Sequence, residues 1–270
     1  MTKKIFLAAV FFLPLAAGAQ TTDTDAGTDV RGRASIEIDY KVFKGFHVSL
    51  EEEVRAIGNL KEFERSQTTL SASYKFNKYV KAGLGYALQE KTKNSSGAFT
   101  TRHRLMGDVT GTYRTGDWQL SLRERIQLTH RPGSMNPYQN VRNAVALKSR
   151  IGMKYRGFRH IGPYASFELR NQLNQPWGTV TSTTPSMTGK NKPYWDYEPS
   201  GYNHRYIDRY RGTLGAQFKL AEHSSLDVYC LLDSCRDYDL DTNADGSRLF
   251  SCICEDSFNI SLCVGYKFSF

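Results

Sequence analysis

The sequence predicts an all-β protein, a transmembrane antiparallel up-and-down β-barrel of about twelve strands, with ten strands as the alternative. Three observations predict this fold. Apolar and polar residues alternate in runs of about ten or more residues. The connections between these runs are alternately short and long, and aromatic residues lie beside the short ones. After the N-terminal segment, no stretch approaches eighteen apolar residues, which excludes a helical membrane protein.

The N-terminal segment has the three parts of a secretory signal peptide. Lys3 and Lys4 precede an apolar run at residues 5–15, and the small residues 17–19 follow it. The apolar run is too short to span a bilayer as a helix. We therefore expect a signal peptide over residues 1–20 and a single outer-membrane barrel domain over residues 21–270.

The strands are expected in pairs joined by short turns. They cover residues 36–42 and 46–51, 70–76 and 80–88, 105–113 and 118–128, 145–155 and 165–169, 214–220 and 226–232, and finally 258–270. These are eleven runs, whereas single-chain bacterial barrels have even numbers of strands. Either another strand lies near residues 23–33 or within 173–203, or one run is wrongly divided. Longer polar loops are expected at 58–64, 90–100, 130–141, 173–203 and 237–249.

Aromatic residues on the expected outer face flank the short turns. They are Phe46, Phe76, Tyr113, Trp118, Tyr155, Phe218, Phe268 and Phe270. Rings at one level around a barrel are typical of the interfacial girdle of an outer-membrane protein, here on the periplasmic side. Since hydrocarbon contains no water, the sheet must close so that no edge is unpaired. A long secreted β-sandwich is the alternative that alternation alone would allow.

The basic composition does not indicate nucleic acid as a partner. The net charge is +9, but the basic residues are spread along strands of an exported protein. The sequence also contains no Gly-rich phosphate loop and no HExxH motif. We expect an integral protein of the bacterial outer membrane with lipid as its partner, and a homo-oligomer is a further alternative.

The inward-facing positions of the expected strands are strongly charged. They are Glu51, Glu53, Arg55, Arg102, Arg104, Asp108, Arg123, Arg125, Lys148, Arg150, Lys154, Glu168, Arg170, Arg209 and Arg211. In a small barrel such side chains can fill the interior and neutralise one another. Because the bases outnumber the acids in this set, a narrow anion-favouring channel is the alternative.

Two acids interrupt the apolar outer face. Glu52 is the next residue after Leu50 on the expected outer face, and Glu124 lies between Leu122 and Ile126 on that face. Either a bulge rotates each acid inward, or the two acids mark a protein contact or a lipid-facing site. Barrel lipases carry a Ser-His pair on the lipid face, and Ser149 and His103 have outward parity on the strands flanking Glu124. No GxSxG motif accompanies them.

The segment DLDTNADGS resembles the start of a calcium-binding loop. Its candidate ligands are Asp239, Asp241, Asn243 and Asp245, but the twelfth position from Asp241 is Cys252 where Glu is expected. Asp, Asn and Gly are equally the residues of a hairpin turn. We expect no cofactor, with a weak calcium site as the alternative.

Five cysteines fall within residues 230–263, and export makes disulfides feasible. Cys235 and Cys252 are nearly symmetric about the turn, but strict alternation places them on opposite faces. A bridge between them therefore needs a bulge or an irregular loop. The aromatic residues of the 173–203 segment either pack into the barrel mouth, which we expect, or contact sugars or a partner.

Two segments also carry a family resemblance. SIEIDYKVFKGFHVSLEEEVR, at residues 35–55, and DYDLDTNADGSRLFSCICEDSFNISLCVGYKFSF, at residues 237–270, resemble the uncharacterised family called domain of unknown function 2490. The resemblance covers essentially the whole mature chain. It implies a barrel of the outer membrane in Bacteroides-like bacteria and implies no activity. The cysteines in SCICED and SLCVG are atypical of the family.

Together these features predict an outer-membrane barrel with a structural or interaction role, or with a narrow anion-favouring pore. The alternative from another class is a lipid-modifying barrel enzyme.

Overall fold

The computed structural model describes residues 24–92, 99–189 and 192–270. The expected signal peptide at residues 1–20 lies outside the described residues, as does most of the expected loop at 90–100. Among the described residues, no helix is long and apolar enough to cross a membrane.

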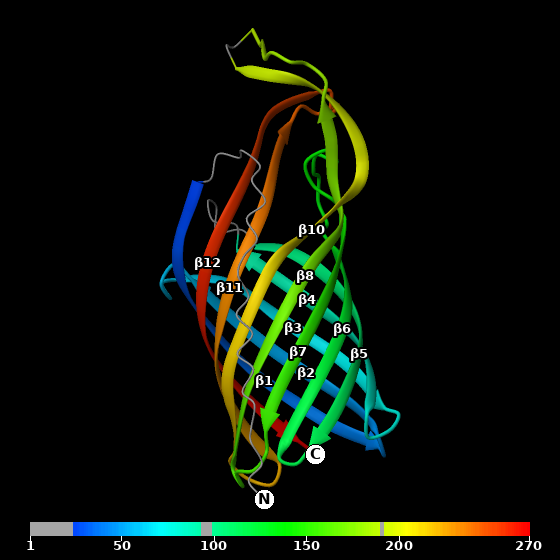
Figure 1. Ribbon diagram of the computed structural model, residues 1–270, viewed down its shortest axis with the longest axis vertical. Coiled ribbons are helices and arrows are strands. Elements are labelled where there is room, and N and C mark those ends of the chain that lie inside the picture. Colours follow the sequence, from blue (N-terminus) through cyan, green and yellow to red (C-terminus); the bar gives the residue numbers. More distant parts are fainter. Residues whose placement is uncertain (1–23, 93–98, 190–191) are drawn as a thin grey trace, which may run out of the picture.

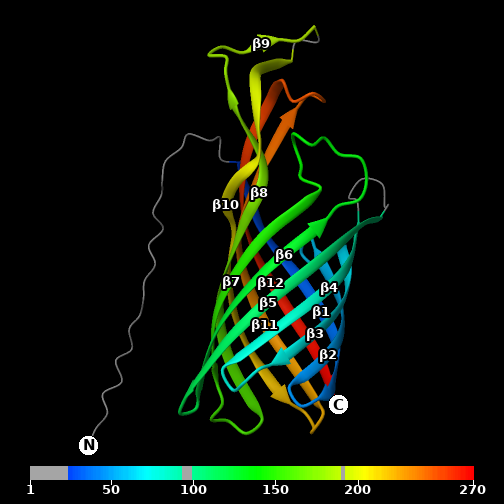
Figure 2. The ribbon, with the colours of Figure 1, turned by 90° about the vertical axis from the view of Figure 1, so that its right-hand side faces the viewer.

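The protein is a closed β-barrel extended at one end by two long hairpins (Figures 1 and 2). The described residues form twelve strands: β1 (Thr24–Phe43), β2 (Phe46–Ile57), β3 (Glu62–Lys75), β4 (Val80–Thr92), β5 (Phe99–Thr115), β6 (Trp118–His130), β7 (Asn143–Tyr155), β8 (Ile161–Val180), β9 (Ser186–Met187), β10 (Pro193–Lys219), β11 (Ser224–Thr242) and β12 (Arg248–Ser269). Eleven of them form the wall, and the two-residue strand β9 pairs only with β10.

The barrel closes through a parallel pair of strands. Neighbouring wall strands are antiparallel in chain order, but β1 and β12 run in the same direction, with Ile36 opposite Tyr266 and Ile38 opposite Phe268. An odd number of strands joined by hairpins leaves the first and last strands pointing the same way, and a parallel ladder then pairs their edges. The expectation of an even-numbered wall is therefore wrong, although the prediction of about twelve strands in a closed barrel is confirmed.

The two places proposed for a further strand have different outcomes. The segment near residues 23–33 is the first part of β1 rather than a separate strand, whereas β9 lies within 173–203. The short turns occur where alternation placed them. Gly45 and Gly116 have φ angles of 88° and 56°, which glycine adopts without steric cost.

Two of the expected long loops are instead strands. The segments 173–203 and 237–249 mostly continue β8, β10, β11 and β12 beyond the wall (Figure 2). Tyr197, Leu240 and Leu249 form a small buried apolar cluster there, with Trp177 packed against it. Backbone pairing of β10 with β12 joins the two hairpins, so the two segments pair with each other beyond the wall.

The two faces of the wall differ in chemistry. Leu84, Leu214 and Ile36 are more than half exposed on the outer face, whereas the largest fully buried side chains are polar, namely Gln89, Asn259, Asp208 and Ser261. Near the short turns, aromatic rings touch in pairs, with ring centroids 5.0 Å apart for Phe43 and Phe46 and 4.9 Å apart for Trp118 and Tyr155. The wall is therefore apolar outside and polar inside.

Candidate functional site: the charged interior of the barrel

The strand registers arrange the interior side chains in rows across the sheet. One row runs through Asp108, Arg125, Lys148, Arg170 and Arg209 on β5, β6, β7, β8 and β10. Directly opposite residues on one face of an antiparallel pair have Cβ atoms roughly 5 Å apart. This row therefore places four basic groups beside one another with an acid only at one end.

The next row, toward the short turns, has mixed charge. It contains Arg123, Arg150, Glu168, Arg211 and Asp233, on β6, β7, β8, β10 and β11. Acids and bases alternate here from Arg150 to Asp233, whereas Arg123 and Arg150 are neighbouring bases. All fifteen charged residues selected from the sequence lie on the interior face of the wall. The exposed apolar residues of the same strands lie on the opposite, outer face.

Several interior charges form ion pairs. Arg125 donates to Asp108 at 2.7 Å, Arg123 contacts Glu168 at 3.0 Å, and Arg55 contacts Glu53. Arg170 donates through Nε to Asp208 at 2.7 Å, and a second guanidinium nitrogen pairs with the same carboxylate. These contacts match the sequence-based expectation of mutual neutralisation for part of the interior.

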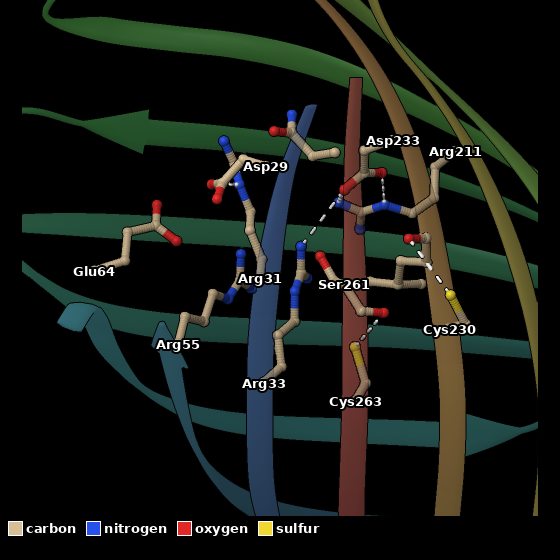
Figure 3. Close-up of polar contacts among 12 residues, drawn as sticks. Asp29, Arg31, Arg33, Arg55, Glu64, Arg211, Cys230, Asp233, Ser261 and Cys263 are labelled. Carbon is tan, nitrogen blue, oxygen red and sulfur yellow. Dashed lines mark hydrogen bonds and ion pairs between the residues drawn. The ribbon is translucent and has the colours of Figure 1, made fainter. Parts of the chain in front are cut away.

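Asp233 is the centre of an ion-pair network beside the closing seam (Figure 3). Arg211 on β10 donates to both carboxylate oxygens, at 2.5 and 2.9 Å, and Arg33 on β1 lies 3.6 Å away. Asp233 itself, on β11, is only 3% exposed. One carboxylate therefore neutralises bases from both sides of β12, whose residue Ser261 is fully buried between them.

Sequence reasoning missed both of the acids that complete these contacts. Asp233 has inward parity next to the outward Leu232, so alternation along β11 could have found it. Asp208 could not have been found in this way. The pairing of β8 with β10 shifts between Ile207 and Arg209, so Asp208 and Arg209 both point inward.

Six of the selected bases form no ion pair within the described part of the chain. They are Arg102, Arg104, Lys148, Arg150, Lys154 and Arg209. Arg104 donates to the hydroxyl of Thr129 at 3.3 Å, and Lys154 donates to Gln217. The buried Nε of Arg209 has no hydrogen-bond partner among the described residues. The interior therefore keeps an excess of positive charge.

The acids Glu52 and Glu124 are exposed on the outer face, and neither is rotated inward by a bulge. Glu52 accepts a hydrogen bond from Thr68 at 2.5 Å, and Glu124 accepts one from Ser149 at 2.6 Å. Of the two interpretations made from sequence, the inward rotation is wrong. Glu124 lines an apolar groove of about 590 Å³, which adjoins a second groove of about 680 Å³ and shares Leu84 and Gly107 with it.

The outward Ser149 and His103 do not form a pair. Ser149 lies opposite Glu124 and His103 lies opposite His130, so the two are separated by six residues along β6, from 124 to 130. At roughly 3.3 Å per residue this is about 20 Å. His103 instead contacts the hydroxyl of Tyr86 at 2.7 Å.

The hairpin tip at residues 243–247 is organised as a turn. The carboxylate of Asp245 accepts hydrogen bonds from the backbone and hydroxyl of Ser247, which lower its pKa, and Asp241 pairs with Lys192 at 3.0 Å. In the part of the chain that the structure describes, no three His, Cys, Asp or Glu side chains gather to hold a metal. Asp239, Asp241, Asn243 and Asp245 therefore do not converge on one point.

The disulfide considered between Cys235 and Cys252 is absent from the described residues. Cys235 lies opposite Ser257 and Cys252 lies opposite Leu240, and both are free thiols. The ladder of β11 and β12 shifts register between Asp241 and Thr242, next to the pair of Leu240 with Cys252, but this shift does not bring Cys252 opposite Cys235.

Aromatic residues pack together at the base of the extension. The rings of Trp177 and His204 are stacked with centroids 4.2 Å apart, and Tyr238 meets both edge-on. Burial in this cluster lowers the pKa of His204 from its ordinary value of 6.5. Trp177 of the 173–203 segment thus packs against Tyr238 of the β11–β12 hairpin.

The fold and its interior define a closed β-barrel with an apolar outer wall and a base-rich interior. The chain belongs to the family described as protein of unknown function (DUF2490), whose model matches residues 34–237. The family predicted from the sequence is thereby confirmed, although the match ends at residue 237 and the C-terminal segment 237–270 on which the resemblance was partly drawn lies beyond it. No curated protein matches the chain.

Proposed function

We propose that this protein is an integral barrel of the bacterial outer membrane whose interior forms a narrow, anion-favouring pore. The row of Lys148, Arg170 and Arg209 on three neighbouring strands is the observation that carries this proposal.

The membrane part of the proposal rests on the outer face. Its exposed side chains are apolar over most of the wall, and burying them in lipid removes that surface from water. The aromatic pairs near the short turns suit the interface between lipid and water, where such rings are favoured. A closed wall also leaves no backbone groups unpaired in hydrocarbon.

The anion preference rests on charge. A ring of basic side chains attracts anions and repels cations within a confined space. Lys148, Arg150 and Arg209 are half-buried on the interior face, and they lack ion pairs within the described ranges. If the interior served only as a neutral filling, each base would be expected to have an acid partner, as Arg125 and Arg211 do.

A structural or interaction role is the competing function. It is supported by the ion pairs and fully buried polar side chains of the interior, which reduce the open cross-section. The alternative of a lipid-modifying enzyme would need a Ser-His pair, and Ser149 and His103 lie too far apart to form one. Association into a homo-oligomer through the outer-face acids Glu52 and Glu124 stays a separate hypothesis.

Current measurement tests the function. The purified barrel is inserted in a planar lipid bilayer, and the reversal potential is measured under a KCl gradient. We expect a small, steady current whose reversal potential has the sign of anion selectivity. A sealed bilayer containing verified folded protein would refute the pore and favour the structural role. Cation selectivity would refute the charge argument.

A further inference from the structure

We infer that the barrel interior contains a specific binding site for a small multivalent oxyanion such as phosphate, formed by Arg104, Lys148 and Arg209. This inference rests on the proposed function for the route by which the anion enters, but binding itself does not require a current.

The first step of the argument is the arrangement of like charges. Lys148 lies directly opposite Arg170, and Arg170 lies directly opposite Arg209. Like charges directly opposite one another on one face of a sheet are destabilising. Three consecutive bases across a wall therefore need negative charge from another source.

The described residues supply a direct ion pair for only one of the three. Asp208, which is 1% exposed, is occupied by Arg170 and by Gln172, whose amide donates to it at 2.7 Å. Lys148 and Arg209, on either side of Arg170, have no ion pair or hydrogen bond from their side chains in the described part of the chain. The positive charge is thus left at two points flanking a neutralised arginine.

A third base approaches the same region from β5. Arg104 lies within electrostatic range of Arg170 and Arg209, and Lys148 lies within range of Arg104 and Arg209 as well as of the acid Glu168. Since Thr129 takes only one donor of Arg104, most of this guanidinium is available to a ligand. Basic groups from β5, β7 and β10 therefore act on one another electrostatically within the interior.

The donor set indicates the class of ligand. Two guanidinium groups and one ammonium offer several directed N–H donors, which suit the several oxygens of a tetrahedral anion. A monovalent halide would neutralise only one of the charges and would leave most donors unused. Arg209 keeps its buried Nε without a partner among the described residues, and an oxyanion oxygen would provide one.

Inorganic phosphate is the probe for the test. Its binding to the folded barrel in detergent is measured by titration calorimetry at constant ionic strength, with chloride as the balancing ion. The unfolding temperature is measured in parallel, because a ligand that binds only the folded state raises it. The variants are Lys148→Met and Arg209→Gln, and the control is Lys219→Gln, an exposed base on the same strand β10.

We expect phosphate to bind wild type and the Lys219→Gln variant equally, and each interior variant to bind at least about tenfold more weakly. Both interior variants should fold without phosphate, since each removes an unpaired charge. Equal binding by all four proteins would place phosphate elsewhere and overturn the inference. A variant that cannot fold would also overturn it, because the base would then be structural. Absence of binding in a barrel that carries an anion current would refute the site alone, whereas binding without current would refute only the pore.

Discussion

The two sides of the barrel interior differ in whether their basic side chains form ion pairs. Beside the closing seam, Asp233 neutralises Arg33 and Arg211 and is itself almost completely buried. Across β7 to β10, Lys148 and Arg209 flank Arg170 and form no ion pair of their own among the described residues. Ion pairs therefore stabilise the side of the wall beside Asp233. Repulsion between bases destabilises the side that contains Lys148 and Arg209, where an anion can bind.

This difference predicts opposite signs for charge removal on the two sides. Where a base has a carboxylate partner, removing the carboxylate leaves a buried charge uncompensated. Where bases face one another, removing one relieves repulsion. The free energy of unfolding therefore separates a structural charge from a functional one.

The largest effect is expected at the seam. Asp233→Asn leaves Arg33 and Arg211 without their carboxylate, so the free energy of unfolding should fall by about 3–5 kcal/mol. Urea unfolding in lipid vesicles measures it. The control is Asp256→Asn, which removes the half-exposed partner of Arg236 and should cost no more than about 1 kcal/mol. Equal losses for the two variants would contradict the structural role of Asp233.

The outer face provides a third environment for comparison. Glu124→Leu removes a carboxylate from the face proposed to contact lipid, and its hydrogen bond from Ser149 is lost as well. The net result should be a rise of about 1 kcal/mol in unfolding free energy in vesicles. Glu52→Leu should have the same effect on the unfolding free energy, since Glu52 accepts an equivalent hydrogen bond from the hydroxyl of Thr68.

The matched control for these variants is Glu222→Leu, in an exposed short turn, which should leave stability unchanged. A clear loss of stability for both Glu124→Leu and Glu52→Leu would mean that these acids hold the wall together. It would also remove the proposed lipid contact from this part of the surface.

On the side that contains Lys148 and Arg209, the expected change in unfolding free energy is smaller than at the seam and has the opposite sign. Lys148→Met removes the charge opposite Arg170 and keeps the length of the side chain, so the free energy of unfolding should rise by about 0.5–1 kcal/mol. The same urea titration, without phosphate, measures it. A loss comparable to that of Asp233→Asn would show that both sides neutralise their bases equally.

The smallest effect is expected in the extension, away from both sides of the interior. His204 is held neutral because burial against Trp177 lowers its pKa below 6.5. The unfolded segment takes up a proton more readily, so the packing of the extension is stable above about pH 6.5 and weakens as pH falls through the lowered pKa.

Hydrogen exchange of the β8–β10 extension at several pH values measures this change. His204→Gln should remove the pH dependence while leaving the exchange of the wall strands unaltered. Identical pH dependence in wild type and variant would assign the effect to another group.

Period-two alternation predicted the wall because every wall strand has one apolar and one polar face. The same rule placed Arg123, Arg125 and Lys148 on the interior face, without indicating which of them has an acid partner. It failed at Asp208, because a bulge places two consecutive residues on one face. It also failed in the extension, where β8, β10, β11 and β12 continue without a long apolar face and therefore resemble loops in sequence.

The parallel seam was missed for a different reason. Alternation gave eleven runs, which is the number of wall strands, but the preference of bacterial barrels for even numbers argued for another strand. Backbone pairing between β1 and β12 is a long-range property that local pattern does not contain. The absent disulfide between Cys235 and Cys252 follows from the same ladder geometry, since their register depends on the whole β11–β12 hairpin.

Ion selectivity of a charge-neutralised barrel tests the central claim most directly. The reversal potential under a KCl gradient is compared for wild type, for Lys148→Gln combined with Arg209→Gln, and for Arg236→Gln, whose base is half-exposed and already paired. We predict anion selectivity for wild type and for Arg236→Gln, and a reversal potential close to zero for the double variant. The same selectivity in all three proteins, or no current from the folded wild type, would contradict the account.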